Sequence, residues 1–378
     1  MSICDSKQRE EKAVMRRVRW VWAALLIWAM LPRLDAAGQD VRRELTFPDL
    51  PGYETLVCDF HMHTVFSDGL VWPPVRVDEA WRTGLDVIVI TDHIEYQPHR
   101  DDVPTNFKRS YELAVGAARQ KNILIALGAE ITRSTPPGHF NALFLNDVEP
   151  LAVEGFLDAI EAANAQGAFV FWNHQAWKGE EAGSWREEHQ TMLEKGWLHG
   201  MEVYNGESYY PTAHRWCLEK NLTMLGNSDI HAPELRTQNT PSDHRTATLV
   251  FVKAGNRSIE GVHEALRERR TVVWGGERLI GREEWLRPLF EASVIVDPPH
   301  VRDRNGRAVF EVHNLGPVDV QLTRRSGGGP NELKIPAWGT VLVTTRDAET
   351  PMAYTVANWW VAPDKGLDIE WRCPPKQE

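Results

Sequence analysis

The sequence predicts an α/β domain, either a barrel or an open parallel sheet, followed by a small β-sandwich. The 378 residues have an ordinary globular composition, with 42% hydrophobic and 25% charged residues. Short, continuously apolar runs alternate with helix-like stretches over most of the chain, which is typical of strands covered on both faces. From Phe290 onward the helical pattern stops, and short strands alternate with turns.

The N-terminus has the order of an export signal. Basic residues between Lys7 and Arg19 precede the apolar run Trp20–Leu31, and Leu34–Ala37 forms an imperfect cleavage site. We therefore expect residues 1–36 to be a signal peptide and the protein to be periplasmic or extracellular. Because the apolar run has only 12 residues, no stable membrane span is expected, and an uncleaved anchor is the alternative.

The α/β domain is expected over residues 37–287. Its predicted strands are Leu56–Phe60, Leu85–Thr91, Ile123–Ala129, Phe140–Leu145, Ala168–Trp172, Gly200–Tyr204, Thr223–Asn227 and Thr246–Val252. The predicted helices between them are Arg76–Thr83, Asn106–Lys121, Val153–Gln166, His189–Lys195, Thr212–Lys220 and Ser258–Arg269. This alternation is the pattern of a parallel sheet with helices around it.

The sandwich is expected over residues 288–378. Its predicted strands are Ala292–Val296, Ala308–His313, Val318–Thr323, Thr340–Thr345 and Ala353–Ala357. Turn-rich segments, such as Asp303–Gly306 and Ser326–Pro330, separate them.

Charge and cysteine content exclude several classes of protein. The formal charge is −11, so the chain lacks the basic footprint of a protein that binds nucleic-acid duplexes. The four cysteines form no C-x-x-C pair, which excludes a zinc ribbon and a thioredoxin-like motif, and they are too few for a disulfide scaffold.

Residues that bind metals follow the predicted strands, one strand end after another. His61 and His63 close the first strand, and residues two apart in a strand point to the same side. Active sites of α/β barrels lie at this end of the strands. The residues with this placement are His61, His63, Asp68, His93, Glu130, His139, His174, Asp229 and His231.

Nine nitrogen and oxygen donors are too many for one tetrahedral ion. They suit two to three divalent ions that share a carboxylate, and the mixture of donors fits Mn²⁺, Zn²⁺ or Fe²⁺. Each motif by itself is weak, since a lone H-x-H is more often structural. Their occurrence in order at successive strand ends favours one shared metal centre.

These motifs resemble the polymerase and histidinol phosphatase (PHP) family of metal-dependent phosphoesterases. The resemblance begins with Asp59–Thr64, Ser67–Gly69 and Gly84–Asp86 leading into Ile90–His93. It continues in the family's order through Glu130, His139, His174 and Ser228–His231. It covers roughly residues 55–275 and implies a distorted (β/α)7 barrel with up to three metal ions.

Further segments resemble a subgroup of secreted bacterial phosphodiesterases that hydrolyse organophosphate diesters, the Sb-PDE family. These segments are Phe47–Tyr53, Val71–Pro73, Glu130–Ser134, Pro136–Ala142 and Glu194–Gly200. One departure is Gln175, which stands where the family usually has a proline after Asn-His. Such a change leaves the ligand His174 intact but can alter the loop.

The resemblance also implies how the ligands are grouped. His61, His63, Glu130 and Asp229 would hold the first ion. Glu130 would bridge to a second ion, which His139 and His174 also bind. Asp68, His93 and His231 would hold the third.

Residues outside the ligand set have less specific expected roles. Metal coordination lowers the pKa of water from about 16 to about 7, which supplies a hydroxide for attack at phosphorus. Arg133 and Arg245 are candidates to hold the other phosphate oxygens, with surface salt bridges as the alternative. His244, His199 and His214 are possible proton donors to the leaving group, with a solvated histidine as the alternative for each.

Two further expectations concern residues near the motifs. Asp92 is a candidate to orient a ligand imidazole, with a strand-end cap as the alternative. Four of the 16 tryptophans can wall a pocket for an aryl group or pack in the core, and Trp172 is expected to pack behind the site; they are Trp72, Trp172, Trp177 and Trp185.

The function expected is an exported phosphodiesterase that hydrolyses small (organo)phosphate diesters by a metal-bound hydroxide. A phosphomonoesterase, or a hydrolase of carboxyl or carbamate esters, would use the same metals. The third alternative is a non-catalytic, metal-holding binding protein of the cell envelope. A monoester carries one more negative charge, and the motifs are not rich in Lys or Arg, which favours diesters.

Overall fold

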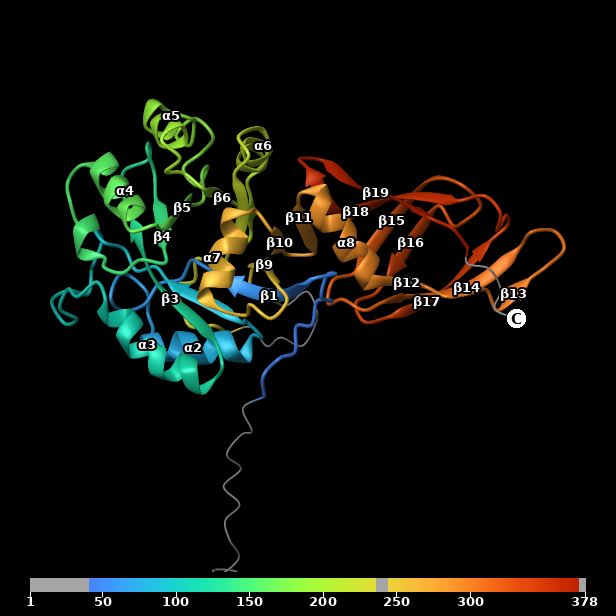
Figure 1. The fold of residues 1–378 in the computed structure, drawn as a ribbon, viewed down its shortest axis with the longest axis horizontal. Coiled ribbons are helices and arrows are strands. Elements are labelled where there is room, and N and C mark those ends of the chain that lie inside the picture. Colours follow the sequence, from blue (N-terminus) through green and yellow to red (C-terminus); the bar gives the residue numbers. More distant parts are fainter. Residues whose placement is uncertain (1–40, 236–243, 374–378) are drawn as a thin grey trace, which may run out of the picture. The chain divides into compact units, whose positions relative to one another are not determined.

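The computed structural model describes residues 41–235 and 244–373 (Figure 1). The expected signal peptide, residues 1–36, lies outside this range. Within the described residues, no helix is both long enough and apolar enough to cross a bilayer.

The first three long strands form the parallel part of the sheet. They are β1 (Tyr53–Asp59), β2 (Val87–Ile90) and β3 (Leu124–Ile131), which pair in that order. The crossovers contain α2 (Pro73–Arg82) and α3 (Arg109–Gln120). All four residues of β2 are buried, as its continuously apolar sequence predicts.

The next strand departs from an all-parallel sheet. Strand β4 (Phe140–Leu143) is antiparallel to both β3 and β5 (Phe169–Trp172). The segment between β3 and β4 is too short for a parallel crossover, so the chain turns back. Parallel pairing resumes from β5 through β6 (Gly200–Asn205) to β8 (Thr223–Asn227). The elements between these strands are η1 (Glu149–Leu151), α4 (Phe156–Ala165), α5 (Glu187–Glu194), β7 (Ser208–Tyr209) and α6 (Pro211–Glu219).

Side chains close the sheet where β8 meets the strands near β1. Strand β9 (Ala247–Lys253) is antiparallel to β1, and β10 (Thr271–Gly275) is antiparallel to β9. The Thr248 hydroxyl accepts from the Gly226 N–H at 3.0 Å and donates to the Gly226 carbonyl at 2.8 Å. A Cβ on Gly226 would lie 2.3 Å from Val273 Cγ1, so only glycine allows β8 to approach β10 this closely.

The expected domain boundary between Arg287 and Pro288 falls inside a helix. After α7 (Ile259–Arg267) and β11 (Arg278–Gly281), helix α8 runs over Glu283–Ser293. The prediction that helical structure stops by Phe290 is therefore wrong by one turn, and the strand expected from Ala292 begins at Val294. The division of the chain at residue 288 stays a prediction.

The C-terminal strands form two facing sheets. One contains β12 (Val294–Val296), β13 (Val301–Arg302), β14 (Ala308–Asn314) and β17 (Thr340–Thr345). The other contains β15 (Val320–Ser326), β16 (Glu332–Ile335), β18 (Met352–Ala362) and β19 (Lys365–Trp371). Phe310 and Tyr354, one from each sheet, belong to the same buried cluster, as a sandwich requires.

The second C-terminal sheet is continuous with the barrel sheet. Strand β18 pairs in parallel with β11, with Leu279 opposite Trp359. The same buried cluster contains Leu249 of β9 and Val356 of β18. The fold is therefore a mixed α/β barrel with a C-terminal β-sandwich, as the sequence predicts, and one core serves both parts.

Candidate metal centre

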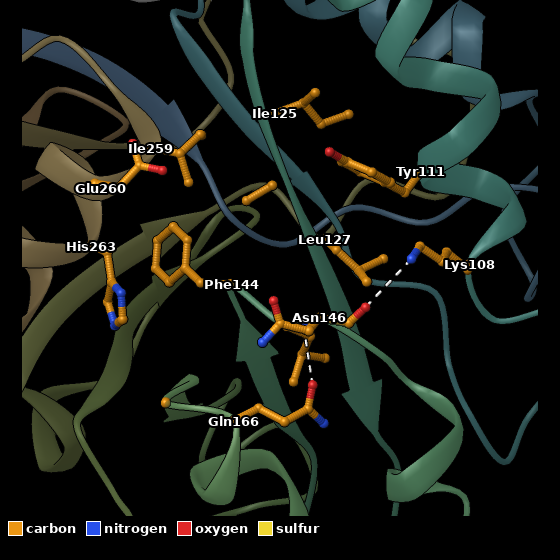
Figure 2. Close-up of a pocket in the computed structure, with 13 residues that line it drawn as sticks. Lys108, Tyr111, Ile125, Leu127, Phe144, Asn146, Gln166, Ile259, Glu260 and His263 are labelled. Carbon is orange, nitrogen blue, oxygen red and sulfur yellow. Dashed lines mark hydrogen bonds between the residues drawn. The ribbon is translucent and has the colours of Figure 1, made fainter.

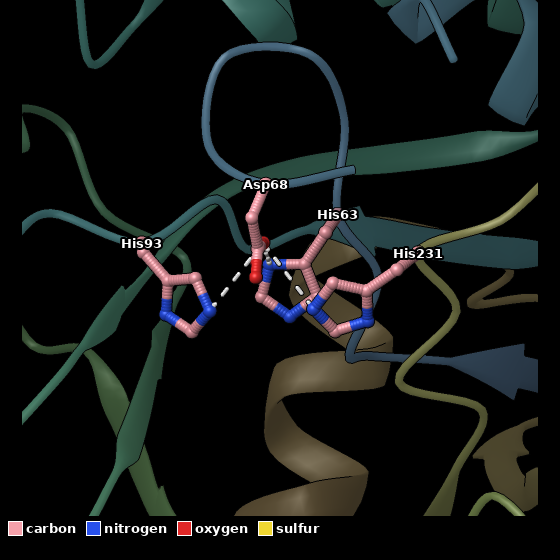
Figure 3. A group of neighbouring side chains, drawn as sticks. All are labelled: His63, Asp68, His93 and His231. Atoms are coloured by element: carbon pink, nitrogen blue, oxygen red, sulfur yellow. Dashed lines mark ion pairs between the residues drawn. The ribbon is translucent and has the colours of Figure 1, made fainter. Parts of the chain in front are cut away.

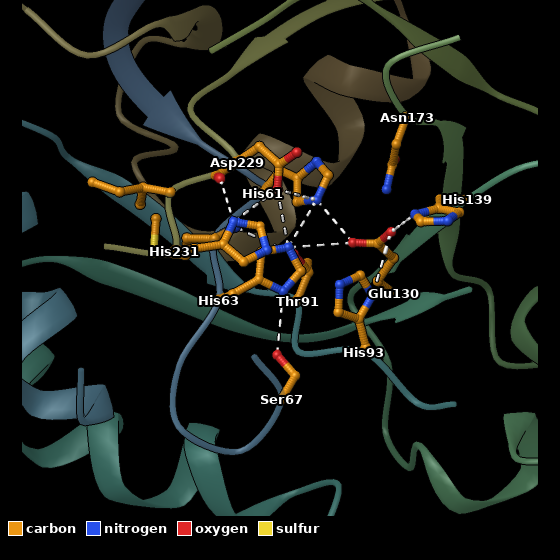
Figure 4. A network of polar contacts seen from close by, with 12 residues as sticks. His61, His63, Ser67, Thr91, His93, Glu130, His139, Asn173, Asp229 and His231 are labelled. Carbon is orange, nitrogen blue, oxygen red and sulfur yellow. Dashed lines mark hydrogen bonds and ion pairs between the residues drawn. The ribbon is translucent and has the colours of Figure 1, made fainter. Parts of the chain in front are cut away.

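Four buried donor atoms lie together at the C-terminal ends of β1, β3 and β8 (Figure 4). Glu130 Oε2 lies 2.8 Å from His61 Nε2 and 3.3 Å from His63 Nε2. Asp229 Oδ1 lies 3.1 Å from each of these two nitrogens, which are 3.1 Å apart. With metal–ligand bonds of about 2.1 Å, neighbouring ligands are about 3.0–3.4 Å apart. These four atoms therefore have the spacing of ligands around one ion.

A second place for an ion is marked by buried polar atoms without hydrogen bonds. Glu130 Oε1 and His139 Nδ1 are 2.7 Å apart, yet neither has a hydrogen-bond partner among the described residues. His174 Nδ1 is also buried and has no hydrogen-bond partner among the described residues. Burying unpaired polar atoms is costly, and a cation bound between them removes that cost. Since each oxygen of Glu130 faces a different set of donors, this carboxylate can bridge two ions.

Figure 3 shows the third group, Asp68, His93 and His231, beside His63. This group is more open to solvent than the first. Asp68 Oδ1 lies 3.2 Å from His231 Nε2 and 3.5 Å from His93 Nε2. The His231 side chain is 36% exposed and that of Asp68 21%, whereas His61 is fully buried. The turn that carries Asp68 needs a glycine, because a Cβ on Gly69 would lie 2.5 Å from the backbone of His63.

The structure thus brings all nine predicted donors together. They come from the ends of β1, β2, β3, β5 and β8 and from the residue that precedes β4. Four overlapping groups have donor atoms within 4.8 Å of one another: His63–Asp68–His93–His231, His61–Glu130–His174, His61–His63–Asp229 and His93–Glu130–His139. The geometry is compatible with the predicted grouping, which stays a prediction.

Two of the donor residues have strained backbones. His174 has φ of 28° and Asp229 has φ of 52°, in the left-handed region that costs an L-residue about 1–2 kcal/mol. The His174 N–H donates to Glu202 Oε2 at 2.8 Å, and the Asp229 N–H donates to the His61 carbonyl at 2.9 Å. These bonds hold both side chains toward the centre, where such strain is characteristic of functional sites.

Sequence analysis missed Glu202, the carboxylate that joins the ligands from behind. It is fully buried in β6 and accepts from His61 Nδ1 at 2.8 Å. It also accepts from the amides of Asn205 at 2.8 Å and Asn227 at 2.9 Å. A carboxylate behind a ligand histidine fixes the tautomer and the ring orientation. The available signal was an acidic residue inside an otherwise apolar strand.

Arg76 of α2 was also missed, and it holds the backbone beneath the site. This fully buried guanidinium donates to the carbonyls of His63 at 2.8 Å and His231 at 2.6 Å. Glu79 neutralises it at 2.6 Å. One side chain thereby ties the segment after β1 to the segment after β8.

The predicted catalytic roles of Arg245 and His244 are not supported. Arg245 is buried in ion pairs with Asp59 at 3.3 Å and Glu234 at 3.4 Å. The His244 ring stacks on Trp274, with centroids 3.4 Å apart, and its two nitrogens lie 2.8 Å from backbone carbonyl oxygens. Neither residue lines the cavity at the metal centre. These contacts are structural, and a catalytic role for either residue stays a prediction without support from them.

The other two proposed proton donors also have structural contacts. His199 Nδ1 accepts from the Val170 N–H at 2.8 Å, and burial lowers the pKa of His199 to about 3. His214 lies 2.9 Å from the Tyr209 hydroxyl, and burial lowers the pKa of His214 to about 4. Both rings are neutral near pH 7, and neither lines the cavity.

Asp92 holds a turn rather than an imidazole. Its carboxylate accepts from the Thr64 N–H at 2.7 Å and from the Ser67 hydroxyl at 2.9 Å. The ring of His93 is oriented instead by the Thr132 hydroxyl, 2.6 Å from its Nδ1, which leaves Nε2 facing Asp68. Asp92 therefore supports the turn that presents Asp68.

The electrostatics of the cage favour binding of cations. Burial alone lowers the pKa of His61, but the nearby carboxylates, Asp229 foremost, raise it well above its usual value. Burial also lowers the pKa of His63, but the nearby carboxylates have the larger effect and raise this pKa to about 9. Burial raises the pKa of Glu130, yet the histidines bring this pKa well below its ordinary value. These shifts mean that protons and metal ions compete for the same donor atoms.

A cavity of about 710 Å³ opens over the metal centre. Its lining includes Arg133, whose guanidinium pairs with Glu95 and donates to the Val153 carbonyl at 2.8 Å. Among the described residues, Lys178 is the second cationic side chain that lines the cavity. Of the five catalytic candidates outside the ligand set, Arg133 alone lines this cavity; the others are Arg245, His199, His214 and His244.

The four tryptophans near the motifs have different environments. Trp177 lines the cavity, with its ring centroid 5.6 Å from that of His139. Trp172 is buried behind the site, as expected, and stacks on His189 at 3.9 Å. Trp185 packs against the buried hydrophobic cluster that contains Trp172. Trp72 contacts Phe66 and does not line the cavity.

A second cavity, of about 610 Å³, lies near the start of β3, at the opposite end of that strand from Glu130 (Figure 2). Phe144 stacks on His263 there, with centroids 4.4 Å apart, and Lys108 donates to the Asn146 carbonyl at 3.4 Å. It contains none of the predicted site residues.

Comparison with known proteins gives matches among solved structures alone. No protein-family model matches the chain, and no curated protein matches it. A candidate metal-dependent phosphoesterase from Bifidobacterium adolescentis aligns at 19% identity over 55% of this chain and 95% of its own, with a TM-score of 0.38. An amidohydrolase from Chromobacterium violaceum with bound sulfate aligns at 15% identity over 58% and 98%, with a TM-score of 0.37. Similarity at this level supports no functional inference.

A much stronger match covers both parts of the fold. A two-domain protein from Bacteroides vulgatus, which contains a predicted PHP-like metal-dependent phosphoesterase, is 42% identical to this chain. The alignment covers 88% of this chain and 98% of that one, with a TM-score of 0.82. Together with the assembled donor residues, this similarity identifies the chain as a member of the PHP-like metal-dependent phosphoesterases.

Proposed function

We propose that this protein is an exported phosphodiesterase that hydrolyses small phosphate diesters on a cluster of two to three divalent ions. The observation that carries the proposal is the assembly of nine metal donors at the base of a cavity of about 710 Å³. Such a cavity has room for ester groups as well as the phosphate. Export rests on the N-terminal sequence, and N-terminal sequencing of the mature protein from fractionated cells tests it.

The donors divide into three ion sites in this proposal. His61, His63, Glu130 and Asp229 would hold one ion. Glu130, His139 and His174 would hold the second, and Asp68, His93 and His231 the third. When bound, such ions activate water and neutralise the charge of a phosphate. Arg133 would orient a non-bridging phosphate oxygen from the cavity wall.

Preference for a diester is supported by the charge of the cavity. Among the described residues, its lining contains two Lys or Arg side chains, Arg133 and Lys178, and Arg133 already pairs with Glu95. A monoester, with one more negative charge, would gain from additional cations. Tyr96, Trp177 and Tyr210 offer apolar surface instead. The sequence motifs shared with the Sb-PDE subgroup support the same preference.

The test is a metal assay combined with an ester panel. The mature chain is purified without added metal, and its metal content is measured by mass spectrometry. kcat/KM is then compared for bis(4-nitrophenyl) phosphate and 4-nitrophenyl phosphate, with chelator and after readdition of Mn²⁺, Zn²⁺ or Fe²⁺. We expect chelator-sensitive turnover with a higher kcat/KM for the diester. A higher value for the monoester, or turnover that resists chelation, would contradict the proposal.

A matched pair of variants ties the activity to the cage. Glu130→Gln removes the bridging carboxylate, and we expect the variant to lose at least one bound ion per chain and most of its activity. Glu149→Gln makes the same change at an exposed position and should leave both unchanged. Because Asp297, Glu311 and His313 form a separate surface group that can hold a metal ion, His313→Gln controls for its share of the metal count.

A further inference from the structure

The loop after β5 folds back on itself through the side chain of Gln175. This residue is 1% exposed, and its Nε2 donates to the Gly183 carbonyl at 2.5 Å. A Cβ on Gly183 would lie 2.1 Å from the Gln175 carbonyl oxygen, so the two ends of the loop are in direct contact. We call this contact the Gln175–Gly183 clasp.

The clasped loop delivers two residues to the cavity. Trp177 is 49% exposed, and its ring centroid lies 5.5 Å from His174 and 5.6 Å from His139. Lys178 Nζ lies 4.5 Å from the centroid of the Trp177 ring. Both side chains line the cavity. An indole that is half exposed beside two ligand histidines presents an apolar surface next to the place where phosphorus would sit.

The backbone of the loop limits the positions that Trp177 can take. The Trp177 N–H donates to the His174 carbonyl at 3.0 Å, and the Gly183 N–H donates to the Gly179 carbonyl at 3.0 Å. The clasp joins these two turns. Without the Gln175 side chain, the segment between residues 176 and 182 would keep its backbone bonds and the bonds that Ser184 and Arg186 donate to the Glu181 carbonyl. None of these bonds links the two ends of the loop, so the indole would sample more positions.

We infer that the Gln175–Gly183 clasp is a specificity device. It positions Trp177 as the wall that binds the ester group which stays on phosphorus, and it favours aromatic groups over methyl. The inference rests on the proposed function. Gln175 is a positioning residue, since it acts through Trp177 and lies behind the cavity lining.

The choice of substrates separates binding of the ester group at Trp177 from the hydrolytic step. Bis(4-nitrophenyl) phosphate and methyl 4-nitrophenyl phosphate release the same leaving group and differ only in the group that remains. For Gln175→Met, which keeps the volume but removes the donor, we expect KM for the bis-aryl diester to rise about fivefold to tenfold. KM for the methyl diester, kcat for both substrates and the metal content should change less than about twofold.

Four further variants complete the design. Gly183→Ala, which forces the loop ends apart, should reproduce the Gln175→Met result, and the double variant should add little because both break one contact. Trp177→Ala should lower the preference for the aryl group at least as strongly as Gln175→Met does. Gln120→Ala, at an exposed position on α3, is the matched control and should behave as the wild type.

Two outcomes overturn the inference. One is an equal loss of kcat and metal content for both diesters in Gln175→Met, which would assign the clasp to holding His174. The other is an unchanged preference in Gln175→Met and Trp177→Ala. If the wild type hydrolyses no diester, the proposed function fails. Calorimetric binding of diphenyl phosphate against dimethyl phosphate then still tests the wall, since the clasp variants should weaken the diphenyl compound selectively.

Discussion

Single buried side chains decide how the nine donors are held. Glu202 contacts the His61 ring, the His174 backbone and two amides, so one carboxylate supports ligands from two of the proposed ion sites. Arg76 fixes the backbone on the other side of the centre. At this scale the predicted donors would supply metal affinity, and their neighbours hold them in place.

Glu202→Gln should weaken metal binding without unfolding the protein. The amide keeps the shape but loses the charge that favours the Nδ1–H form of His61, and it places an NH₂ group among existing donors. We expect the dissociation constant of the tightest ion to rise about 10-fold to 100-fold. Competition with a chromophoric chelator measures it, with the exposed Glu219→Gln as the control. Wild-type affinity in Glu202→Gln would show that this carboxylate does not orient the site.

At the scale of elements, short loops at strand ends carry the chemistry and helices brace them. Helix α5 shows this through His189, whose Nε2 lies 2.8 Å from the Pro137 carbonyl, just before the donor His139. The Arg186 N–H donates to the other ring nitrogen at 2.9 Å. Burial lowers the pKa of His189 to about 4, so the ring is neutral in the folded chain.

This histidine should make the fold sensitive to acid. An unfolded chain takes up a proton at His189 below its ordinary pKa of about 6.5, whereas the folded chain resists until about pH 4. Stability is therefore complete above pH 6.5 and is lost as the pH falls toward 4, by about 2 kcal/mol at pH 5. Urea unfolding of the chelated protein at pH 7 and pH 5 should show a smaller loss for His189→Gln. The exposed His300→Gln should lose as much as the wild type, and equal losses in all three would contradict the argument.

At the scale of the whole molecule, the sandwich completes the barrel rather than standing apart. Strand β18 extends the sheet at β11, and α8 crosses the expected boundary at residue 288. Phe290 of α8 packs edge-on against Trp359 of β18, with centroids 5.6 Å apart, so the helix contacts the C-terminal sheet that continues the barrel sheet. A module on a flexible linker would not share a sheet with the barrel in this way.

A chain that ends at residue 287 should therefore fail to fold. It would cut α8 in half, leave β11 without its parallel partner and expose apolar surface around Leu279 and Leu286. We expect no cooperative thermal transition and elution as aggregates in size-exclusion chromatography. A chain that ends at residue 373 keeps every described element and should melt like the full protein. A folded, metal-binding product that ends at 287 would show that the sandwich is separable.

The sequence by itself determined the α/β order and most strands to within a few residues, and it predicted that nine possible metal donors lie at strand ends. These features are local in sequence. A buried strand is recognised by its own apolar run, and a possible donor is recognised by its place at the end of such a run. Gln175 was also visible, as a departure from the family pattern, although its partner Gly183 was not.

The tertiary structure alone decided what surrounds the donors. Glu202 contacts His61 across 141 residues of sequence, and Arg245 is withdrawn from the cavity by Asp59, 186 residues away. The continuity of β11 with β18 is of the same kind. Charged side chains look alike in sequence whether they face substrate or pair in the interior. Their roles depend on which distant segments pack against them, and the local sequence pattern does not show this packing.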